Sequence, residues 1–252
     1  MRPVPEQFDS SGCFETIRVE NGRPVDLREH MQRIRGSLHA LAVDFSGQDG
    51  LTAEIRKEAR RIGSGYVRVA VSRYGEKRKI LHSSARTPYA PALQNRGVRL
   101  RTVPTRCPSG ETSLSLSKHS ERLSSILARC EGGKSFDVLR FGSHGFLTEG
   151  TVSNFFFVKE GTLFTPPLWI GVLEGVMRGK VLQAARRLKI PVREVPVTRH
   201  DLFNADEAFI TNVLMKLLPV LEVDGRRIGE IAPGPVTHLL MSKLRGKNAT
   251  IR

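Results

Sequence analysis

Cysteine is scarce in this 252-residue sequence, which contains only Cys13, Cys107 and Cys130. The three are far apart and odd in number, so they form neither a disulfide framework nor a CxxC metal pair. A small buried hydrophobic side chain is the simplest role for each. The sequence therefore predicts no disulfide and no metal site.

Long apolar runs are also missing. No stretch approaches the length of a membrane-spanning helix, and the opening residues, MRPVPEQFDSSG, lack the apolar core of a signal peptide. We therefore expect a cytoplasmic protein that does not cross a membrane. With 39% hydrophobic and 26% charged residues, the composition is typical of a globular chain long enough for two domains.

Acidic residues are outnumbered by basic residues, 25 against 40, so the formal net charge is +15. Such an excess can mark a nucleic-acid surface or a field that attracts anionic substrates. The basic residues are scattered, however, and aromatic residues make up only 6% of the chain, which disfavours a base-stacking platform. We expect a small-molecule substrate and no nucleic-acid partner.

The first hundred residues predict a small α+β domain. CFETIRVENGRPV (13–25) alternates in part, and Asn21-Gly22 is a strong hairpin-turn signal. Asp26 is a candidate N-cap for the amphipathic pattern that follows. We expect helices over 26–41 and 51–62, and further strands over 65–75 and 96–104.

The predicted interdomain linker is 106–116, in a stretch rich in Pro, Ser, Thr and Gly. It separates a small domain at 1–105 from a larger one at 117–252. The larger domain is expected to begin with a helix over 118–131, with Leu123, Ile126, Leu127 and Cys130 along one helical face. Strands are then expected at 136–142, 154–167, 192–198 and 207–228, with helices over 173–190, at 199–204 and from Pro235.

One stretch, from Ser117 to Asn154, combines a lysine with a carboxylate. Lys118 begins a helical pattern, and Glu149 closes the strand and turn that follow. A helix–strand unit of this length could fold both onto one site, as an aldehyde cofactor with a basic ring nitrogen would require. GVLEGVMRGK (171–180) adds a Gly-bearing turn that feeds a helix, which suits a phosphate, and FITNVLM (209–215) ends an apolar strand with small polar groups.

Five stretches resemble the fold-type IV pyridoxal-phosphate enzymes, the family of branched-chain and D-amino-acid aminotransferases and aminodeoxychorismate lyase. They follow the family's order and span nearly the whole chain. The resemblance implies a two-domain α+β fold, with a small α/β N-terminal domain and a larger β-barrel-like C-terminal domain with helices. The stretches are GCFETIRVENGRPVDLREHMQRIRGS, KHSERLSSILAR, LTEGTVSNFFFVKEGTLFTPP, GVLEGVMR and ADEAFITNVLMKLLPV.

The resemblance also implies roles for individual residues, with pyridoxal 5'-phosphate as the cofactor. Lys118 matches the lysine that holds the cofactor covalently and then moves protons, and Glu149 matches the carboxylate that pairs with the ring nitrogen. Arg33 matches the arginine that binds the phosphate. Further cofactor contacts are implied for Ser153, Val176, Met177, Asn212 and Val213, and a substrate carboxylate is assigned to Arg73 or Arg78.

Two departures from the aminotransferase pattern favour the lyase. Met177 stands where many aminotransferases carry a threonine, and Asn212-Val213 replaces a small Gly/Ser-Thr pair. The first hypothesis is therefore elimination of pyruvate from 4-amino-4-deoxychorismate, giving 4-aminobenzoate for folate synthesis. The alternative is an aminotransferase of branched-chain or D-amino acids, and a third is a cofactor-free basic binding protein. The family resemblance also implies a homodimer.

Overall fold

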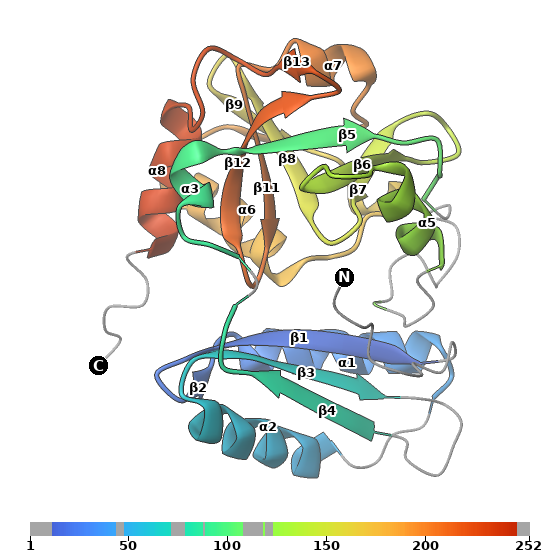
Figure 1. The fold of residues 1–252 in the computed structure, drawn as a ribbon, viewed down its shortest axis with the longest axis vertical. Helices are drawn as coiled ribbons and strands as arrows, with labels where there is room; N and C mark the ends of the chain where they lie inside the picture. The colour runs from blue at the N-terminus through green and yellow to red at the C-terminus, as the bar shows by residue number, and fades with distance from the viewer. Residues whose placement is uncertain are drawn as a thin grey trace. The chain divides into compact units, whose positions relative to one another are not determined.

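The computed structural model describes residues 12–43, 48–71, 79–87, 89–107, 118 and 123–245, and Figure 1 shows their fold. The chain divides into two compact units. The smaller unit comprises Met1–Pro88 and Leu116–Arg122, and the larger one comprises Tyr89–Ser115 and Leu123–Arg252. Each unit has its own hydrophobic core.

The smaller unit contains a four-stranded antiparallel sheet in the order β2-β1-β3-β4. The predicted hairpin is confirmed, because Asn21 and Gly22 both have positive φ, at 50° and 71°, between β1 and β2. The strands are β1 (Cys13–Glu20), β2 (Arg23–Pro24), β3 (Gly65–Val71) and β4 (Lys79–Ser84).

Two helices, α1 (Leu27–Ala40) and α2 (Gln48–Ile62), cover one face of this sheet (Figure 1). Alternate strand residues share a face, so Ile17 and Val67 point together into a core that α1 and α2 close with Ile34 and Ile55. Asp26 occupies the N-cap position of α1 but has a left-handed backbone, with φ of 56°, and its side chain makes no capping hydrogen bond.

The larger unit is built on a nine-stranded mixed sheet in the order β10-β9-β8-β11-β12-β5-β6-β7, with β13 paired to β12. An isolated bridge joins Leu147 of β7 to Val197 beyond β10, so the sheet curls until its two ends meet. The strands are β5 (Val98–Thr102), β6 (Asp137–Phe141), β7 (Leu147–Gly150), β8 (Asn154–Lys159), β9 (Thr162–Thr165), β10 (Val192–Glu194), β11 (Glu207–Asn212), β12 (Lys216–Val223) and β13 (Arg226–Arg227).

The curled sheet has a core on each side. Phe155 and Ile210 point into the cluster that the sheet encloses, whereas Phe156 and Phe209 pack on the opposite face against α6 and α8. This confirms the predicted two-domain α+β fold with a barrel-like larger part. The helices of this unit are α3 (Leu93–Arg96), α5 (Leu123–Glu131), η1 (Leu168–Ile170), α6 (Val176–Arg187), α7 (Arg199–Phe203) and α8 (Pro235–Arg245).

The predicted domain boundaries need correction. The strand expected at 96–104 was assigned to the small domain, but β5 pairs in parallel with β6 and β12 of the larger sheet. Residues 117–122, assigned to the large domain, belong to the smaller unit. Sheet partners are chosen by long-range pairing, which a local pattern does not reveal. Most of the predicted linker, from 108 on, lies outside the described residues.

The apolar face of the helix expected at 118–131 points outward, and the expected burial of Cys130 is wrong. In α5, Leu123, Ile126 and Leu127 are 63%, 54% and 49% exposed, and Cys130 is exposed as well. Only Ala128 is buried in this helix. An apolar stripe therefore faces outward on this chain. Within the described ranges, no helix combines the length and apolar character needed to cross a membrane.

Candidate functional site

Glu149 lies near the end of β7, and two donors hold its carboxylate. Its Oε2 accepts hydrogen bonds from Asn154 Nδ2 at 3.0 Å and from the Leu173 backbone N–H at 3.1 Å. Arg140, itself buried, places Nη2 3.9 Å from Oε1. The carboxylate is thus oriented by Asn154 at the start of β8, by the Leu173 N–H in a loop and by the buried cation of Arg140. Such donors favour the charged form of a carboxylate.

The turn after Glu149 is shaped by a buried carboxylate, Asp137. Its Oδ2 accepts from Ser153 Oγ at 2.6 Å, and its Oδ1 accepts from the backbone N–H and the hydroxyl of Thr151. The only hydroxyl proton of Ser153 is therefore directed at Asp137. The contact of Ser153 with a cofactor ring stays a prediction. In the structure, the Ser153 hydroxyl helps to shape the turn after Glu149 through its bond to Asp137.

Val176 and Met177 form the first turn of α6, as predicted for a phosphate-binding helix start. The first N–H groups of a helix have no acceptor within the helix, so this end attracts anions. The Met177 side chain is buried in the core, so only its backbone can meet a ligand. Gly175 precedes the helix, and a Cβ there would collide with Asn154 Oδ1.

Asn212 ends β11 and folds the turn that follows it. Its Oδ1 accepts from the backbone N–H groups of Leu214 and Met215, both at 2.9 Å, while its Nδ2 donates to the Val152 carbonyl at 3.1 Å. Because Asn154 and Thr211 are paired across β8 and β11, this turn and the turn after Glu149 lie together. Val213 packs against the α6 core.

Arg33 is held in the smaller unit by a carboxylate that the sequence reasoning missed, Glu15. Arg33 Nε and Nη2 donate to Glu15 Oε1 and Oε2 at 2.6 and 2.7 Å, and His30 Nδ1 lies 2.7 Å from Oε2. Burial raises the pKa of Glu15, but the charge of Arg33 and hydrogen bonds from Arg33 and His30 outweigh burial. The pKa of Glu15 therefore lies well below its ordinary value.

Lys118 belongs to the same unit. Its carbonyl accepts from the Phe14 N–H at 2.9 Å, its own N–H donates to Ser37 Oγ at 3.3 Å, and its Nζ lies 5.2 Å from the centre of the Phe14 ring. An ammonium this close to a ring face is stabilised by the π-electrons. The backbone of Lys118 is thus tied to β1 and α1.

The structure brings the predicted residues together in two groups, one in each unit. Lys118 and Arg33 lie in the smaller unit. The remaining residues that are predicted to bind the cofactor lie in the larger unit, near the start of α6 and the turns after β7 and β11. Arg73 and Arg78 lie outside the described residues. The second group comprises Glu149, Ser153, Val176, Met177, Asn212 and Val213.

Asn154 and Glu15 were not singled out from the sequence. A signal for Glu15 exists, because it interrupts the apolar alternation of Cys13, Ile17 and Val19 on the face of β1 that faces the core. Asn154 had only its place directly after a turn, which many surface residues share. Asn154 matters because it holds Glu149, and Glu15 matters because it holds Arg33.

Comparison with known proteins identifies the family. The family model described as "Amino-transferase class IV" matches residues 12–223. The chain belongs to the class IV aminotransferase family. This confirms the resemblance that the five sequence stretches carry.

Three similar proteins illustrate the range of activities in this family. A Methanocaldococcus jannaschii protein, provisionally named a branched-chain-amino-acid aminotransferase, is 32% identical over 93% of this chain and 86% of its own. D-alanine aminotransferase from Bacillus licheniformis is 29% identical over the same shares. The crystal structure of 4-amino-4-deoxychorismate lyase from Pseudomonas aeruginosa has a TM-score of 0.85 and 29% identity, over 97% of this chain and 96% of that one.

Class IV aminotransferases use pyridoxal phosphate, and this is the cofactor of the chain. The residues present fit such a group. A carboxylate held by hydrogen-bond donors suits a protonated ring nitrogen, a helix start suits a phosphate, and a lysine amine suits an aldehyde. Glu149, the α6 start and Lys118 provide these three features.

Proposed function

We propose that this class IV enzyme is a 4-amino-4-deoxychorismate lyase, which eliminates pyruvate and leaves 4-aminobenzoate for folate synthesis. The observation that carries the proposal is its likeness to the Pseudomonas aeruginosa lyase. That likeness spans almost the full length of both chains, whereas the aminotransferases from Methanocaldococcus jannaschii and Bacillus licheniformis extend beyond the matched region.

The phosphate end of the site supports the same proposal. Met177 buries its side chain in the core, so no side-chain hydroxyl is available where many aminotransferases have one. Asn212 uses its side chain to fold the turn at 212–215. Phosphate binding here would therefore rest on backbone N–H groups of the helix start and of this turn.

Bound pyridoxal phosphate would supply a carbonyl for the substrate amine and a ring that accepts an electron pair. Glu149, fixed by Asn154, would keep the ring nitrogen protonated so that the ring can accept that pair. The amine of Lys118 would take the proton next to the substrate nitrogen and return a proton when pyruvate leaves. Arg33 and the α6 start would hold the phosphate.

A class IV aminotransferase is the second candidate, because the two relatives above carry aminotransferase names. It would use branched-chain or D-amino acids with the same lysine, carboxylate and arginine. These residues therefore do not discriminate between the two reactions. A cofactor-free binding protein is disfavoured by membership of a pyridoxal-phosphate family.

The deciding experiment incubates the cofactor-loaded protein with 4-amino-4-deoxychorismate and no amino acceptor, following 4-aminobenzoate and pyruvate. Release of both in equal amounts is expected, and Lys118→Ala should abolish it. In a parallel reaction, branched-chain or D-amino acids are added alone and the absorbance of the cofactor is recorded. Conversion to the pyridoxamine form, without 4-aminobenzoate in the first reaction, would establish the aminotransferase instead.

We also propose that the enzyme is a homodimer, as in the resemblance. The support on this chain is the outward apolar face of α5, with Leu123, Ile126 and Leu127 about half exposed or more. Side chains of this size seldom cluster on the solvent face of a short helix unless a partner covers them.

A further inference from the structure

Glu15 is a buried charge at the centre of the smaller unit. Strand alternation places it on the face of β1 that also carries Cys13 and Ile17, and α1 covers that face. Its side chain is 1% exposed. A carboxylate in such a place is costly unless donors surround it. α1 supplies them from His30 and Arg33, which lie one helical turn apart.

The bonds between Glu15 and Arg33 fix the plane of the guanidinium. Both carboxylate oxygens are used, one on Nε and one on Nη2, at 2.6 and 2.7 Å. A fork of this kind leaves the side chain one orientation about its last bonds. The Nη1 donors then face away from Glu15, because the guanidinium is planar.

His30 supports Glu15 from the other side. Its ring is 1% exposed and Nδ1 lies 2.7 Å from Glu15 Oε2. Since an ionised carboxylate only accepts, the proton of this hydrogen bond is carried by Nδ1. Nε2 has no hydrogen-bond partner in the structure as described. Among the described residues, the His30 ring makes its hydrogen bond to Glu15.

A contact that served only to hold β1 against α1 would not need this arrangement of charged groups. Replacing a buried ion pair with apolar side chains is often neutral or stabilising, so a pair of this kind contributes little stability for its cost. What it does provide is a guanidinium with a set orientation. An arginine fixed in advance loses less side-chain entropy when it binds an anion.

We propose that Glu15, braced by His30, is a positioning residue that orients the Arg33 guanidinium to bind the phosphate of the cofactor. The inference rests on the proposed phosphate role of Arg33 and deepens it. It concerns binding alone, so it stands or falls separately from the choice between lyase and aminotransferase.

The test compares two ligands that differ only in the phosphate. Pyridoxal phosphate and pyridoxal are each titrated into cofactor-free wild-type and Glu15→Gln protein, following absorbance and protein fluorescence. We expect pyridoxal phosphate to bind about tenfold more weakly to the variant, the usual loss for a hydrogen bond to a charged group. Pyridoxal should bind both proteins with the same affinity.

The matched control is Glu58→Gln. Glu58 makes the same two-pronged contact with Arg61, at 2.9 and 2.6 Å, but on the exposed surface of α2. This variant should leave both affinities unchanged. If Glu15→Gln weakened the binding of both ligands equally, Glu15 would have only a structural role and the proposal would be overturned. Unchanged or tighter binding of pyridoxal phosphate would overturn it as well.

Two further variants keep the proposal testable if Glu15→Gln does not fold. His30→Asn removes the hydrogen bond from His30 to Glu15 and leaves the two bonds between Arg33 and Glu15. We therefore expect pyridoxal phosphate alone to bind about threefold more weakly. In an Arg33→Ala background, adding His30→Asn should cost nothing more, because the two act through one guanidinium. Additive losses, or a loss shared by pyridoxal, would contradict the proposal.

Discussion

At the scale of single residues, the pKa of Glu15 makes stability depend on pH. Burial raises the pKa of Glu15, but Arg33 and His30 hold it well below the ordinary value of 4.5. The stabilisation that ionised Glu15 provides to the folded state is fully present above pH 4.5. It is lost as the pH falls through and below 4.5, because the unfolded chain takes up the proton first.

We therefore expect the wild type to lose stability between about pH 6 and pH 3 more steeply than Glu15→Gln. The stability of the wild type relative to Glu15→Gln should fall by about 1.4 kcal/mol for each pH unit below the ordinary value. Urea unfolding of both proteins over this range measures it. A difference that stays constant with pH would show that folding does not lower the pKa of Glu15 and would contradict this prediction.

The three cysteines should differ sharply in reactivity. Burial, with the nearby charge of Glu15, raises the pKa of the Cys13 thiol to about 12, and burial raises that of Cys107 to about 11. Cys130 is exposed. Because the thiolate is the reactive form, one thiol should react with a chromogenic disulfide at about pH 8 in the folded protein, and three after unfolding.

Cys130→Ser identifies the reactive residue. The folded variant should show no fast-reacting thiol, while two react after unfolding. Fast reaction of a second thiol in the folded wild type would mean that the core around Cys13 or Cys107 opens readily.

How far the site could be predicted depends on the kind of role each residue has. Lys118, Glu149 and Arg33 stood out through the family resemblance, because motifs record the groups that act on the cofactor. Asn154 and Asp137 act through hydrogen bonds to other residues. Their partners are set by the fold, which local sequence does not specify.

At the scale of elements, the start of α6 is the most tightly constrained feature of the site. A side chain on Gly175 would collide with the Asn154 amide, which itself holds Glu149. Gly179, one turn further along the same helix, has open space around its missing Cβ.

We expect Gly175→Ala to displace Asn154, to destabilise the protein by about 1–3 kcal/mol and to weaken cofactor binding. Gly179→Ala should be neutral or stabilising by about 0.5–1 kcal/mol, because alanine favours a helix. Thermal unfolding and pyridoxal-phosphate titration of both variants check this. Equal behaviour of the two would show that the close approach at Gly175 is not needed.

The elements themselves were predicted well where their pattern is local. The hairpin at 13–24 and the helices over 27–40 and 176–187 follow from turn residues and apolar spacing. The apolar stripe of α5 has the same spacing and yet faces outward. Periodicity indicates that a face is covered but does not say whether the cover comes from the same chain.

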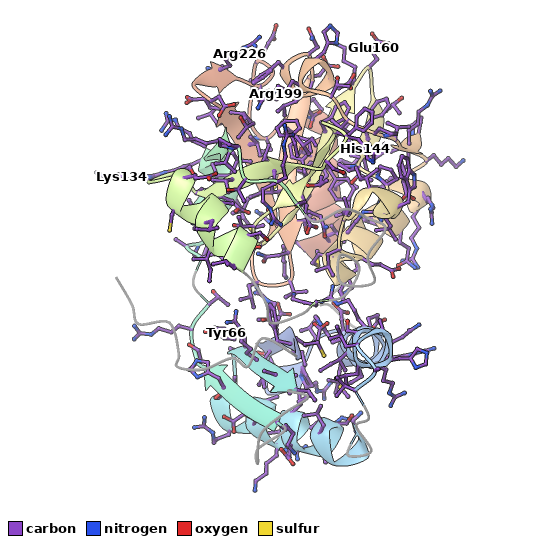
Figure 2. The ribbon with its side chains drawn as sticks, turned by 90° about the vertical axis from the view of Figure 1, so that its right-hand side faces the viewer. Tyr66, Lys134, His144, Glu160, Arg199 and Arg226 are labelled. Carbon is purple, nitrogen blue, oxygen red and sulfur yellow. The ribbon has the colours of Figure 1, made fainter. Side chains whose placement is uncertain are left out.

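At the scale of the whole molecule, many basic side chains of the described residues are exposed. Lys134, Arg199 and Arg226 are exposed on the larger unit, as Figure 2 shows. Arg199 and Arg226 lie over the rings of Phe141 and Phe203, with 4.5 and 4.0 Å between guanidinium carbon and ring centre. We expect exposed charges of this kind to attract anionic ligands.

Assembly is the second property at this scale. If a second copy covers α5, light scattering after size exclusion should give the mass of two chains. Ile126→Glu should shift it to one, because a buried carboxylate without a partner is costly. Lys134→Gln, at an exposed position just beyond α5, changes the net charge by the same single unit and should leave the mass of two chains. A wild type with the mass of one chain would refute the homodimer.

The chain passes between its two units three times, after residues 88, 115 and 122. Neither unit is therefore formed by one continuous segment of the sequence. Truncation at 105 would leave β5 with the smaller fragment and remove from the larger sheet the strand that pairs with both β6 and β12. On the ribosome, the smaller unit stays incomplete until its last segment, with Lys118, has been synthesised. The segment that carries the proposed catalytic lysine is thus the last part of that unit to be made.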